Sequence, residues 1–247
     1  MSHDPEMIRT VGLTKQYGSR TAVDGLDLSV RRGELFSLLG VNGAGKTTTI
    51  RMLSCLSAPT SGEAYVGGYS CTEQSEQVKR IIGISPQDTA VAERLTVREN
   101  LEFMAALYAP TKQICLERTD IMIDLFHLDE VASQQARTLS GGWKRKLSIA
   151  MALIGEPQVL FLDEPTLGLD VLARRELWKV IRRLKENRTI ILTTHYMEEA
   201  EQLSDRIAIL HRGRIKALGT LAEIEKQAGV SGLENAVVAI AGEEEQL

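Results

Sequence analysis

The stretch Gly40-Val41-Asn42-Gly43-Ala44-Gly45-Lys46-Thr47-Thr48 fits G-x-x-x-x-G-K-[ST], a glycine-rich pattern whose backbone N–H groups cradle phosphates. The apolar run 35–39 before it predicts a buried strand, and the run 48–56, which lacks Gly and Pro, predicts a helix. The N-terminus of that helix would offer free N–H groups and a positive dipole to a phosphate. The stretch therefore predicts a nucleoside triphosphate site.

Individual side chains in this loop have predicted roles. Gly40, Gly43 and Gly45 let the backbone bend around an anion without clashes of a Cβ atom. Lys46 can reach the β- and γ-phosphates, and the Thr47 hydroxyl can ligate Mg²⁺.

The whole-chain composition limits the class of protein. The 247 residues, 43% apolar and 25% charged, suffice for one large α/β domain or two small ones. The net charge of −4 does not favour a broad nucleic-acid-binding face, so no nucleic-acid partner is expected. Three cysteines without a CxxC pair predict reduced thiols in a cytosolic protein. Residues 1–5 lack an apolar signal region, and no apolar run reaches the roughly 18 residues that span a bilayer.

Short apolar segments predict β structure at several places. Residues 7–39 suggest strands that are joined at Asp24-Gly25, and residues 64–66 and 81–85 suggest two further strands. Tyr17 lies at a polar turn, where it could stack on a base or pack on a strand edge; both alternatives stay open on the sequence. Gln87 follows the strand 81–85 and could face the nucleotide or be an ordinary loop residue.

Residues 95–135 predict a helical insertion between strands. Thr96 and Glu99 form a capping box that opens a helix ending before Pro110. A second amphipathic helix is predicted at 114–128.

The segment Leu139-Ser140-Gly141-Gly142-Trp143 predicts a second phosphate-binding helix N-terminus, with Ser140 as the N-cap. The helix should end at Gly155. Lys144, Arg145 and Lys146 in its first turns are interpreted as a solvated basic face rather than as ligands.

The apolar strand 159–164 ends in two carboxylates. Functional side chains of buried parallel strands lie at the carboxyl edge of the sheet, where Asp163 can hold Mg²⁺ through water. Glu164 can then orient and polarise a water. The alternative, a helix-capping turn before Pro165, fits poorly beside an upstream phosphate loop.

The last third of the chain adds a helix at 177–184 and a β-branched strand, 189–194, that ends at His195. His195 is followed by an acidic helix, and Asp170 is a loop carboxylate. Residues 207–210 and 214–218 predict a hairpin. A short helix and a tail ending Glu243-Glu244-Glu245 should follow Thr220.

Taken together, these motifs resemble the ABC ATPase family in content, order and spacing, from about residue 7 to about residue 220. Leu139-Ser140-Gly141-Gly142 is the specific part, because other P-loop families lack it. The stretch 194–201 and the segment 232–237 look like a bacterial and archaeal export branch, in which a stand-alone ATPase serves separate membrane subunits.

The resemblance implies an α/β P-loop NTPase fold with a RecA-like core sheet, an N-terminal antiparallel β subdomain and a helical insertion. Residues 1–247 would form one domain, with a helical subdomain at about 88–155 and a C-terminal hairpin and tail at about 205–247. The expected location is the cytoplasmic face of the cell membrane, where membrane subunits hold the chain.

The resemblance also implies residue roles. Tyr17 would stack on adenine, and the residues implied to bind the phosphates are Gly40, Asn42, Gly43, Ala44, Gly45, Lys46, Thr47 and Thr48. Thr47, Gln87 and Asp163 would hold Mg²⁺. Glu164 would be the general base, His195 would contact the γ-phosphate, and Lys46 and Gln87 would assist catalysis.

Three further positions would belong to a second subunit's site. Ser140, Gly141 and Gly142 would face the nucleotide of another copy, or of a homologous ATPase, in a head-to-tail ATP-dependent dimer. Asp170 would bridge the two subunits. Trp143 departs from the family, which usually has Gln there, and this puts only contacts near the ribose in doubt.

The leading hypothesis is the motor subunit of an exporter that couples Mg-ATP-driven dimer closure and hydrolysis to separate transmembrane permease subunits. One alternative is a soluble ABC ATPase in translation or DNA maintenance, although those usually carry two cassettes or a long coiled-coil insertion. An importer subunit is a second alternative. A P-loop kinase gives no reason for Leu139 to Gly142.

Overall fold

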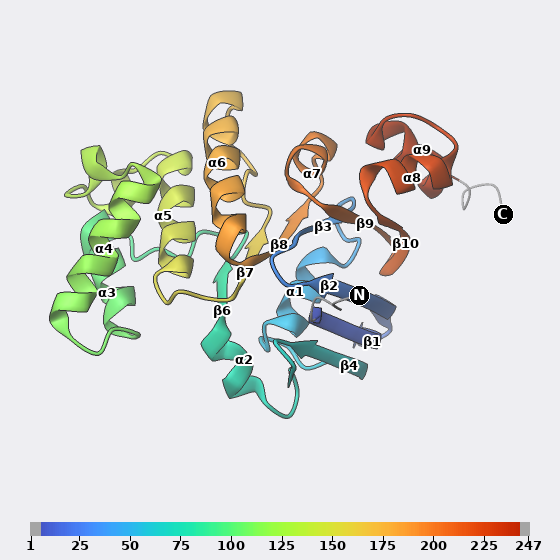
Figure 1. The fold of residues 1–247 in the computed structure, drawn as a ribbon, viewed down its shortest axis with the longest axis horizontal. Helices are drawn as coiled ribbons and strands as arrows, with labels where there is room; N and C mark the ends of the chain where they lie inside the picture. Colours follow the sequence, from blue (N-terminus) through green and yellow to red (C-terminus); the bar gives the residue numbers. More distant parts are fainter. Residues whose placement is uncertain (1–5, 243–247) are drawn as a thin grey trace.

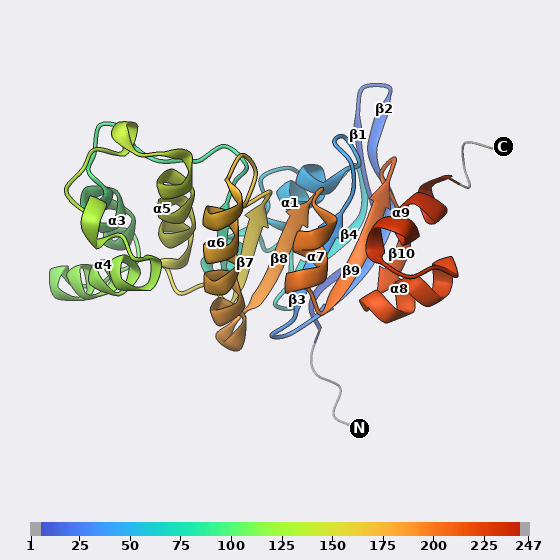
Figure 2. The same ribbon diagram turned by 90° about the horizontal axis from the view of Figure 1, so that it is seen from above.

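Two β-sheets form the body of the molecule (Figures 1 and 2). The computed structural model describes residues 6–242. A four-stranded antiparallel sheet has the order β2-β1-β4-β5, and a six-stranded sheet has the order β10-β9-β3-β8-β7-β6. Within the described residues the strands are β1 (Glu6–Tyr17), β2 (Arg20–Arg31), β3 (Leu35–Leu39), β4 (Ser61–Val66), β5 (Tyr69–Ser70), β6 (Ile82–Ser85), β7 (Val159–Asp163), β8 (Thr189–Thr194), β9 (Arg206–His211) and β10 (Arg214–Gly219).

Helices pack on both sides of the six-stranded sheet. In the same range they are α1 (Lys46–Leu53), α2 (Ser75–Ile81), α3 (Val97–Ala106), α4 (Lys112–Phe126), α5 (Gly141–Leu153), α6 (Val171–Leu184), α7 (Met197–Leu203), α8 (Leu221–Ala228) and α9 (Leu233–Gly242). Single turns of 3₁₀ helix lie at Asp129–Val131, Ala136–Thr138 and Lys185–Asn187. The predicted α/β architecture is confirmed.

The neighbouring strands β9, β3, β8, β7 and β6 run parallel to one another, and β10 is antiparallel to β9. Side chains along β7 alternate between two hydrophobic cores: Val159 and Phe161 face α1 and the antiparallel sheet, whereas Leu160 and Leu162 face α5 and α6. Burial on both faces explains why these strands are apolar runs rather than alternating ones. Because β3, β8 and β7 are parallel neighbours, their carboxyl ends lie together at one edge of the sheet.

The N-terminal hairpin differs from the predicted strands joined at Asp24-Gly25, and this prediction is wrong. Strand β2 is continuous, and a bulge absorbs the irregularity, since Leu13 pairs with Leu26 but Lys15 pairs with Val23. Gly25 takes φ +59°, a left-handed conformation that glycine adopts easily. A glycine at such a bulge looks like a turn in the sequence.

Helices α3, α4 and α5 form a lobe at one end of the molecule (Figures 1 and 2). The predicted capping box is present, because Glu99 N–H donates to Thr96 Oγ1 at 3.1 Å and Thr96 N–H donates to Glu99 Oε2 at 2.7 Å. The hydrogen bonds that the Thr96 N–H and hydroxyl donate to the Glu99 carboxylate lower the pKa of that carboxyl. Thr111 caps α4 in a similar way.

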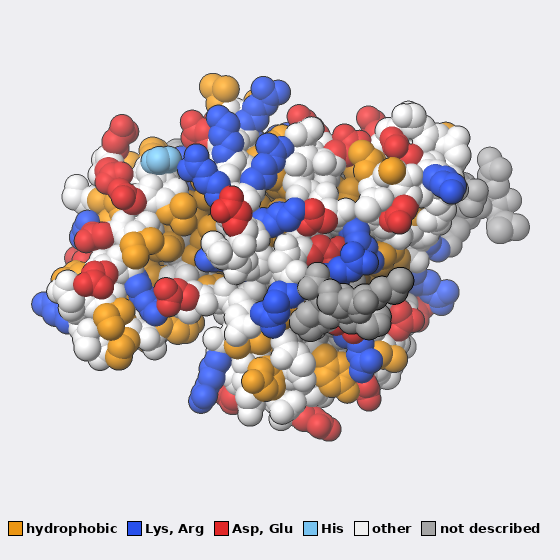
Figure 3. All heavy atoms as spheres, viewed as in Figure 1, with side chains coloured by type: hydrophobic (Ala, Val, Ile, Leu, Met, Phe, Trp, Pro, Cys, Tyr) orange, Lys and Arg blue, Asp and Glu red, His pale blue; other side chains and the backbone are white. Residues whose placement is uncertain are grey.

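Helix α6 is longer than the predicted 177–184 because it begins at Val171. Its inner face is apolar, and Lys and Arg side chains gather over its outer face (Figure 3). Arg182 and Arg183 lie in its last turn, where positive charge complements the helix dipole.

Two helices do not appear among the predicted elements. The region of α2 has one buried side chain, Val78, so it shows no apolar period. Helix α9 lies where a tail was expected; Leu233 and Ala236 bury one side of it against β9 and β10. The acidic end Glu243-Glu244-Glu245 and residues 1–5 lie outside the described residues.

Candidate functional site

The phosphate loop connects β3 to α1, as predicted. Gly45 is the N-cap of α1 with φ +108°, and a Cβ atom there would lie 2.6 Å from the Ala22 carbonyl oxygen. A side chain at Gly40 would run into the Leu210 carbonyl oxygen. Glycine is therefore required at both positions, because the loop is pressed against two other strands.

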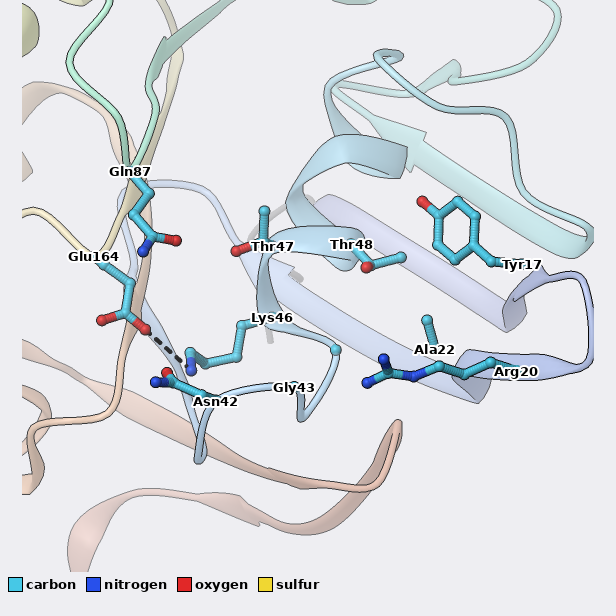
Figure 4. A pocket seen from close by; sticks show the side chains of 11 residues that line it. Tyr17, Arg20, Ala22, Asn42, Gly43, Lys46, Thr47, Thr48, Gln87 and Glu164 are labelled. Atoms are coloured by element: carbon cyan, nitrogen blue, oxygen red, sulfur yellow. Dashed lines mark ion pairs between the residues drawn. The ribbon is translucent and has the colours of Figure 1, made fainter.

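This loop forms one wall of a cavity of about 510 Å³. Tyr17 and Arg20 lie at one end of it, Gln87 and Glu164 at the other, and the loop lies between them (Figure 4). The lining residues are Tyr17, Arg20, Ala22, Asn42, Gly43, Gly45, Lys46, Thr47, Thr48, Gln87 and Glu164. The structure thus brings together most of the residues that the sequence predicts for the nucleotide.

Lys46 and Glu164 form a buried ion pair inside this cavity. Lys46 Nζ lies 3.0 Å from Glu164 Oε1, and each side chain is only 5% exposed. Lys46 Nζ also donates to the carbonyl oxygens of Gly40, at 2.7 Å, and Val41, at 3.2 Å. The Lys46 ammonium is therefore held by two carbonyl oxygens of the phosphate loop and by the Glu164 carboxylate.

The second oxygen of Glu164 lies 2.5 Å from His195 Nδ1. The Glu164 backbone has φ +51°, which is uncommon for a residue with a side chain. Its N–H donates to Thr193 Oγ1 and to the Thr193 carbonyl oxygen, at 3.0 and 3.1 Å. These bonds fix the carboxylate between Lys46 and His195.

Oxygen atoms suited to Mg²⁺ lie next to the phosphate loop. Asp163 Oδ1 accepts hydrogen bonds from Thr47 Oγ1 at 3.1 Å and from Thr193 Oγ1 at 2.5 Å. Between residues 6 and 242 no group of three His, Cys, Asp or Glu side chains could hold a metal alone. A hydroxyl, one carboxylate and the Gln87 amide fit Mg²⁺, which keeps waters and binds substrate phosphates.

The prediction that Arg145 belongs to a solvated basic face is wrong, because Arg145 is buried. Arg145 is only 5% exposed, and its guanidinium donates to the carbonyl oxygens of Pro86, at 2.7 Å, and Gln87, at 2.6 Å. Burial lowers the pKa of Arg145, and nearby carboxylates, Asp163 first, oppose that change. Lys144 and Lys146 do lie nearer the surface, where they pair with Glu93 and Glu176.

The second predicted phosphate-binding element lies outside this cavity. Ser140 caps α5, and Ser140 and Gly141 are exposed to solvent. Of the described residues, none from 139–143 lines the cavity around Lys46. The Trp143 ring instead packs on the flank of α5, with Lys146 Nζ 4.7 Å from its centroid.

Asp170 is more than the loop carboxylate of the prediction. It is the N-cap of α6, and its Oδ1 accepts hydrogen bonds from the N–H groups of Leu172 and Ala173, both at 2.9 Å. Val171 and Leu172 beside it are 59% and 76% exposed. Asp170 does not line the cavity around Lys46.

Arg20 and Ala22 line the cavity but were not among the site residues predicted from the sequence. Arg20 is the charged one of the two. The Arg20 guanidinium nitrogen Nη2 lies 3.4 Å from the position that a Cβ of Gly43 would take. A basic residue directly after the Tyr17-Gly18-Ser19 turn was the available signal.

Comparison with known proteins decides the family. A family model described as ABC transporter matches residues 23–167, more than half of the chain. The chain belongs to the ABC transporter family. Like other ABC cassettes, it is an ATP-binding ATPase with a P-loop NTPase fold.

Two relatives show how much of a transporter this ABC cassette represents. It is 44% identical over 223 residues to the daunorubicin/doxorubicin resistance ATP-binding protein DrrA of Streptomyces peucetius, covering 90% of the cassette and 68% of DrrA. It is 43% identical over 210 residues to the human phospholipid-transporting ATPase ABCA3, covering 85% of the cassette but 12% of ABCA3. The cassette therefore corresponds to a small part of ABCA3 and to about two thirds of DrrA.

Two solved structures resemble the ABC cassette. An ATP-binding subunit of an ABC transporter superposes with a TM-score of 0.86 at 32% identity, covering 95% of the cassette and 99% of that chain. The ATP-binding cassette MJ0796, solved as a dimer in a post-hydrolysis state with ADP and Pi, superposes with a TM-score of 0.79 at 25% identity. The match covers 87% of this cassette and 99% of the MJ0796 chain.

Across residues 6–242 no helix of the cassette combines the length and apolar character that crossing a membrane requires.

Proposed function

We propose that this cassette is the motor subunit of an exporter, and that it couples ATP binding and hydrolysis to movement of separate transmembrane subunits. The observation that carries the proposal is the Glu164 carboxylate, held between Lys46 and His195 at the phosphate end of the cavity. The proposal takes residues 1–247 as a single domain, with a helical subdomain at about 88–155 and a C-terminal hairpin and tail at about 205–247.

In the proposed mechanism Tyr17 stacks on adenine, while Lys46 and the N–H groups of residues 40–48 bind the phosphates. Glu164 accepts a proton from the attacking water, and His195 orients that carboxylate and contacts the γ-phosphate. Thr47, Gln87 and Asp163 would hold Mg²⁺, which supplies positive charge to the phosphate oxygens. Phosphoryl transfer needs mainly positioning and charge stabilisation, which these residues provide.

The site is completed by a second copy of the chain, or by a homologous ATPase. Ser140, Gly141 and Gly142 of that copy face the nucleotide, and Asp170 bridges the two subunits. Support comes from the exposed position of Ser140 outside its own cavity and from the exposed apolar side chains of Val171 and Leu172 next to Asp170. The dimer of MJ0796 is a precedent for such a pairing.

The transmembrane partner docks beside Gln87. A groove of about 360 Å³ there is lined by Ile84, Pro86 and Met104 among others. The neighbouring side chains of Leu107 and Tyr108 are 65% and 47% exposed, which suits burial against another protein. Such docking holds the cassette at the cytoplasmic face of the membrane, and the DrrA name favours an exported drug-like substrate.

Co-purification tests the proposal. The tagged cassette is expressed in its own host and purified in mild detergent with Mg-ATP. Recovery of a multi-helix membrane protein, together with ATPase activity that this partner changes, is expected. Recovery of ribosomes or DNA without a membrane protein would refute the transport role.

A further inference from the structure

A carboxyl group with no role in the mechanism above is buried beside the site. Glu199 is on α7, the helix that begins two residues after His195, and its side chain is 0% exposed. Its Oε1 accepts a hydrogen bond from Trp178 Nε1 of α6 at 3.0 Å. The hydroxyl groups of Thr166 and Thr194 also face the carboxyl.

These contacts join three segments that carry site residues. Thr166 lies two residues after Glu164, and Thr194 directly precedes His195. Trp178 is on α6, whose N-cap is Asp170. Thr166 and Thr194 are fully buried, so the carboxyl and its partners form a closed polar cluster inside the protein.

The cluster holds unsatisfied atoms. Glu199 Oε2 and Thr166 Oγ1 are both buried and have no hydrogen-bond partner among residues 6–242. Buried polar atoms are usually paired, because an unpaired one loses its hydrogen bonds to water.

Burial and neighbouring groups act in opposite directions on the pKa of this carboxyl. Burial raises the pKa of the Glu199 carboxyl, while the hydrogen bond from Trp178, the nearby hydroxyl groups of Thr194 and Thr166 and the charge of Arg174 oppose that rise. Arg174 itself stacks on Tyr196, with its guanidinium carbon 4.6 Å from the ring centroid. A neutral acid can accept from Trp178 through one oxygen and donate to a threonine hydroxyl through the other.

We propose that Glu199 is a positioning residue for ATP hydrolysis, whose buried carboxyl sets the spacing between the loop after Glu164 and the strand end that carries His195. The inference rests on the proposed roles of Glu164 and His195. Glu199 does not line the nucleotide cavity, so it acts on the rate of hydrolysis rather than on nucleotide binding.

The test compares Glu199→Gln, which keeps an acceptor and a donor, with Glu199→Met, which keeps the volume but removes both. Glu199→Met is expected to lower kcat about 10-fold or more while KM for ATP changes less than about 2-fold, since small misplacement of catalytic groups is costly. Glu199→Gln should keep about half or more of kcat, because the amide can replace the acid. The exposed neighbour Glu198, changed to Gln, is the matched control and should behave as the wild type.

Thr166→Val is the second variant in case Glu199→Met fails to fold, and it should lower kcat with KM for ATP unchanged. A readout besides activity uses the fact that the chain has two tryptophans. With Trp143 replaced by Phe, the fluorescence emission reports Trp178 alone, and Glu199→Met but not Glu199→Gln should shift it.

Three results would overturn the inference. They are wild-type kcat in Glu199→Met, equal losses in Glu199→Gln and Glu199→Met, and a loss of ATP affinity or melting temperature large enough to explain the lower rate. A wild-type protein that hydrolyses no ATP would instead refute the proposed function, and this inference would fall with it.

Discussion

Lys46 and Glu164 lie 3.0 Å apart, and both side chains are almost completely buried. Lys46 belongs to the phosphate loop, and Glu164 lies at the strand end 118 positions further along the chain. A phosphate that enters the cavity competes with Glu164 for the same ammonium. Nucleotide binding is therefore expected to release one Glu164 oxygen for the attacking water, while His195 holds the other.

Replacing Glu164 by Gln removes the proposed base but keeps its shape. Hydrolysis should fall about 100-fold or more, the range typical of lost general-base catalysis, while ATP still binds. Because ATP persists, the variant should accumulate as a dimer on size-exclusion chromatography with saturating Mg-ATP. A monomer under those conditions would contradict the composite site.

Replacing Lys46 by Ala removes the partner of a buried carboxylate as well as a phosphate ligand. ATP binding should be lost, and the free energy of unfolding should fall by about 3 kcal/mol, as when one partner of a buried ion pair is removed. Urea denaturation and a nucleotide-binding assay measure the two effects. Lys79→Ala is the control, because the Lys79–Glu76 pair is exposed and should contribute less than about 1 kcal/mol. Retained ATPase activity in Lys46→Ala would refute the assignment of the phosphate loop.

Replacing Tyr17 by Ala tests the adenine end of the cavity. Tyr17 is 49% exposed, and Lys15 Nζ lies 5.2 Å from its ring centroid, so one face of the ring is available for a base. Loss of stacking should raise KM for ATP about 10-fold, since such contacts are worth about 1–3 kcal/mol. Tyr17→Phe should keep the wild-type KM, and Tyr69→Ala, on β5, controls for removal of a surface tyrosine. An unchanged KM in Tyr17→Ala would favour the alternative of a tyrosine packed on the strand edge.

Replacing Arg145 by Lys keeps the charge but not the two-pronged donor that holds the backbone of Pro86 and Gln87. The Gln87 side chain should lose its position, and kcat should fall about 10-fold with little change in ATP affinity. Steady-state ATPase kinetics and a calorimetric binding constant separate the two quantities. Lys144→Ala, one residue earlier and paired only with Glu93 at the surface, is the control. Equal activity in Arg145→Lys and Lys144→Ala would show that the Gln87 loop does not depend on Arg145.

Local signals in the sequence predicted most of the fold. The strand at 35–39, the capping box at Thr96 and the Ser140 cap depend on short-range patterns, and each is confirmed. The bulge at Gly25 was misread because a glycine in a strand and a glycine in a turn look alike. Helix α2 was missed because Val78 alone is buried there, so its apolar residues show no helical period.

The site residues also separate into those that local sequence motifs predict and those that depend on contacts between distant segments. The phosphate loop and the pair Asp163-Glu164 could be predicted because each is a contiguous motif. The burial of Arg145 could not, because its partners Pro86 and Gln87 are 58 and more residues away, and three adjacent basic residues look solvated. Arg20 and the hydrogen bonds that cluster around Glu199 also depend on contacts between distant segments.

Helix α5 carries Ser140 at one end and, five residues later, the Arg145 guanidinium that holds the Gln87 loop. Five residues of α-helix are a stiff rod about 7.5 Å long. In the proposed dimer, a displacement of Ser140 by the second ATPase would therefore move Arg145 and the rim of the groove proposed for the membrane subunit. Helix α5 would then couple the two proposed interfaces, because the same rigid helix contacts the second ATPase and positions the groove for the membrane subunit.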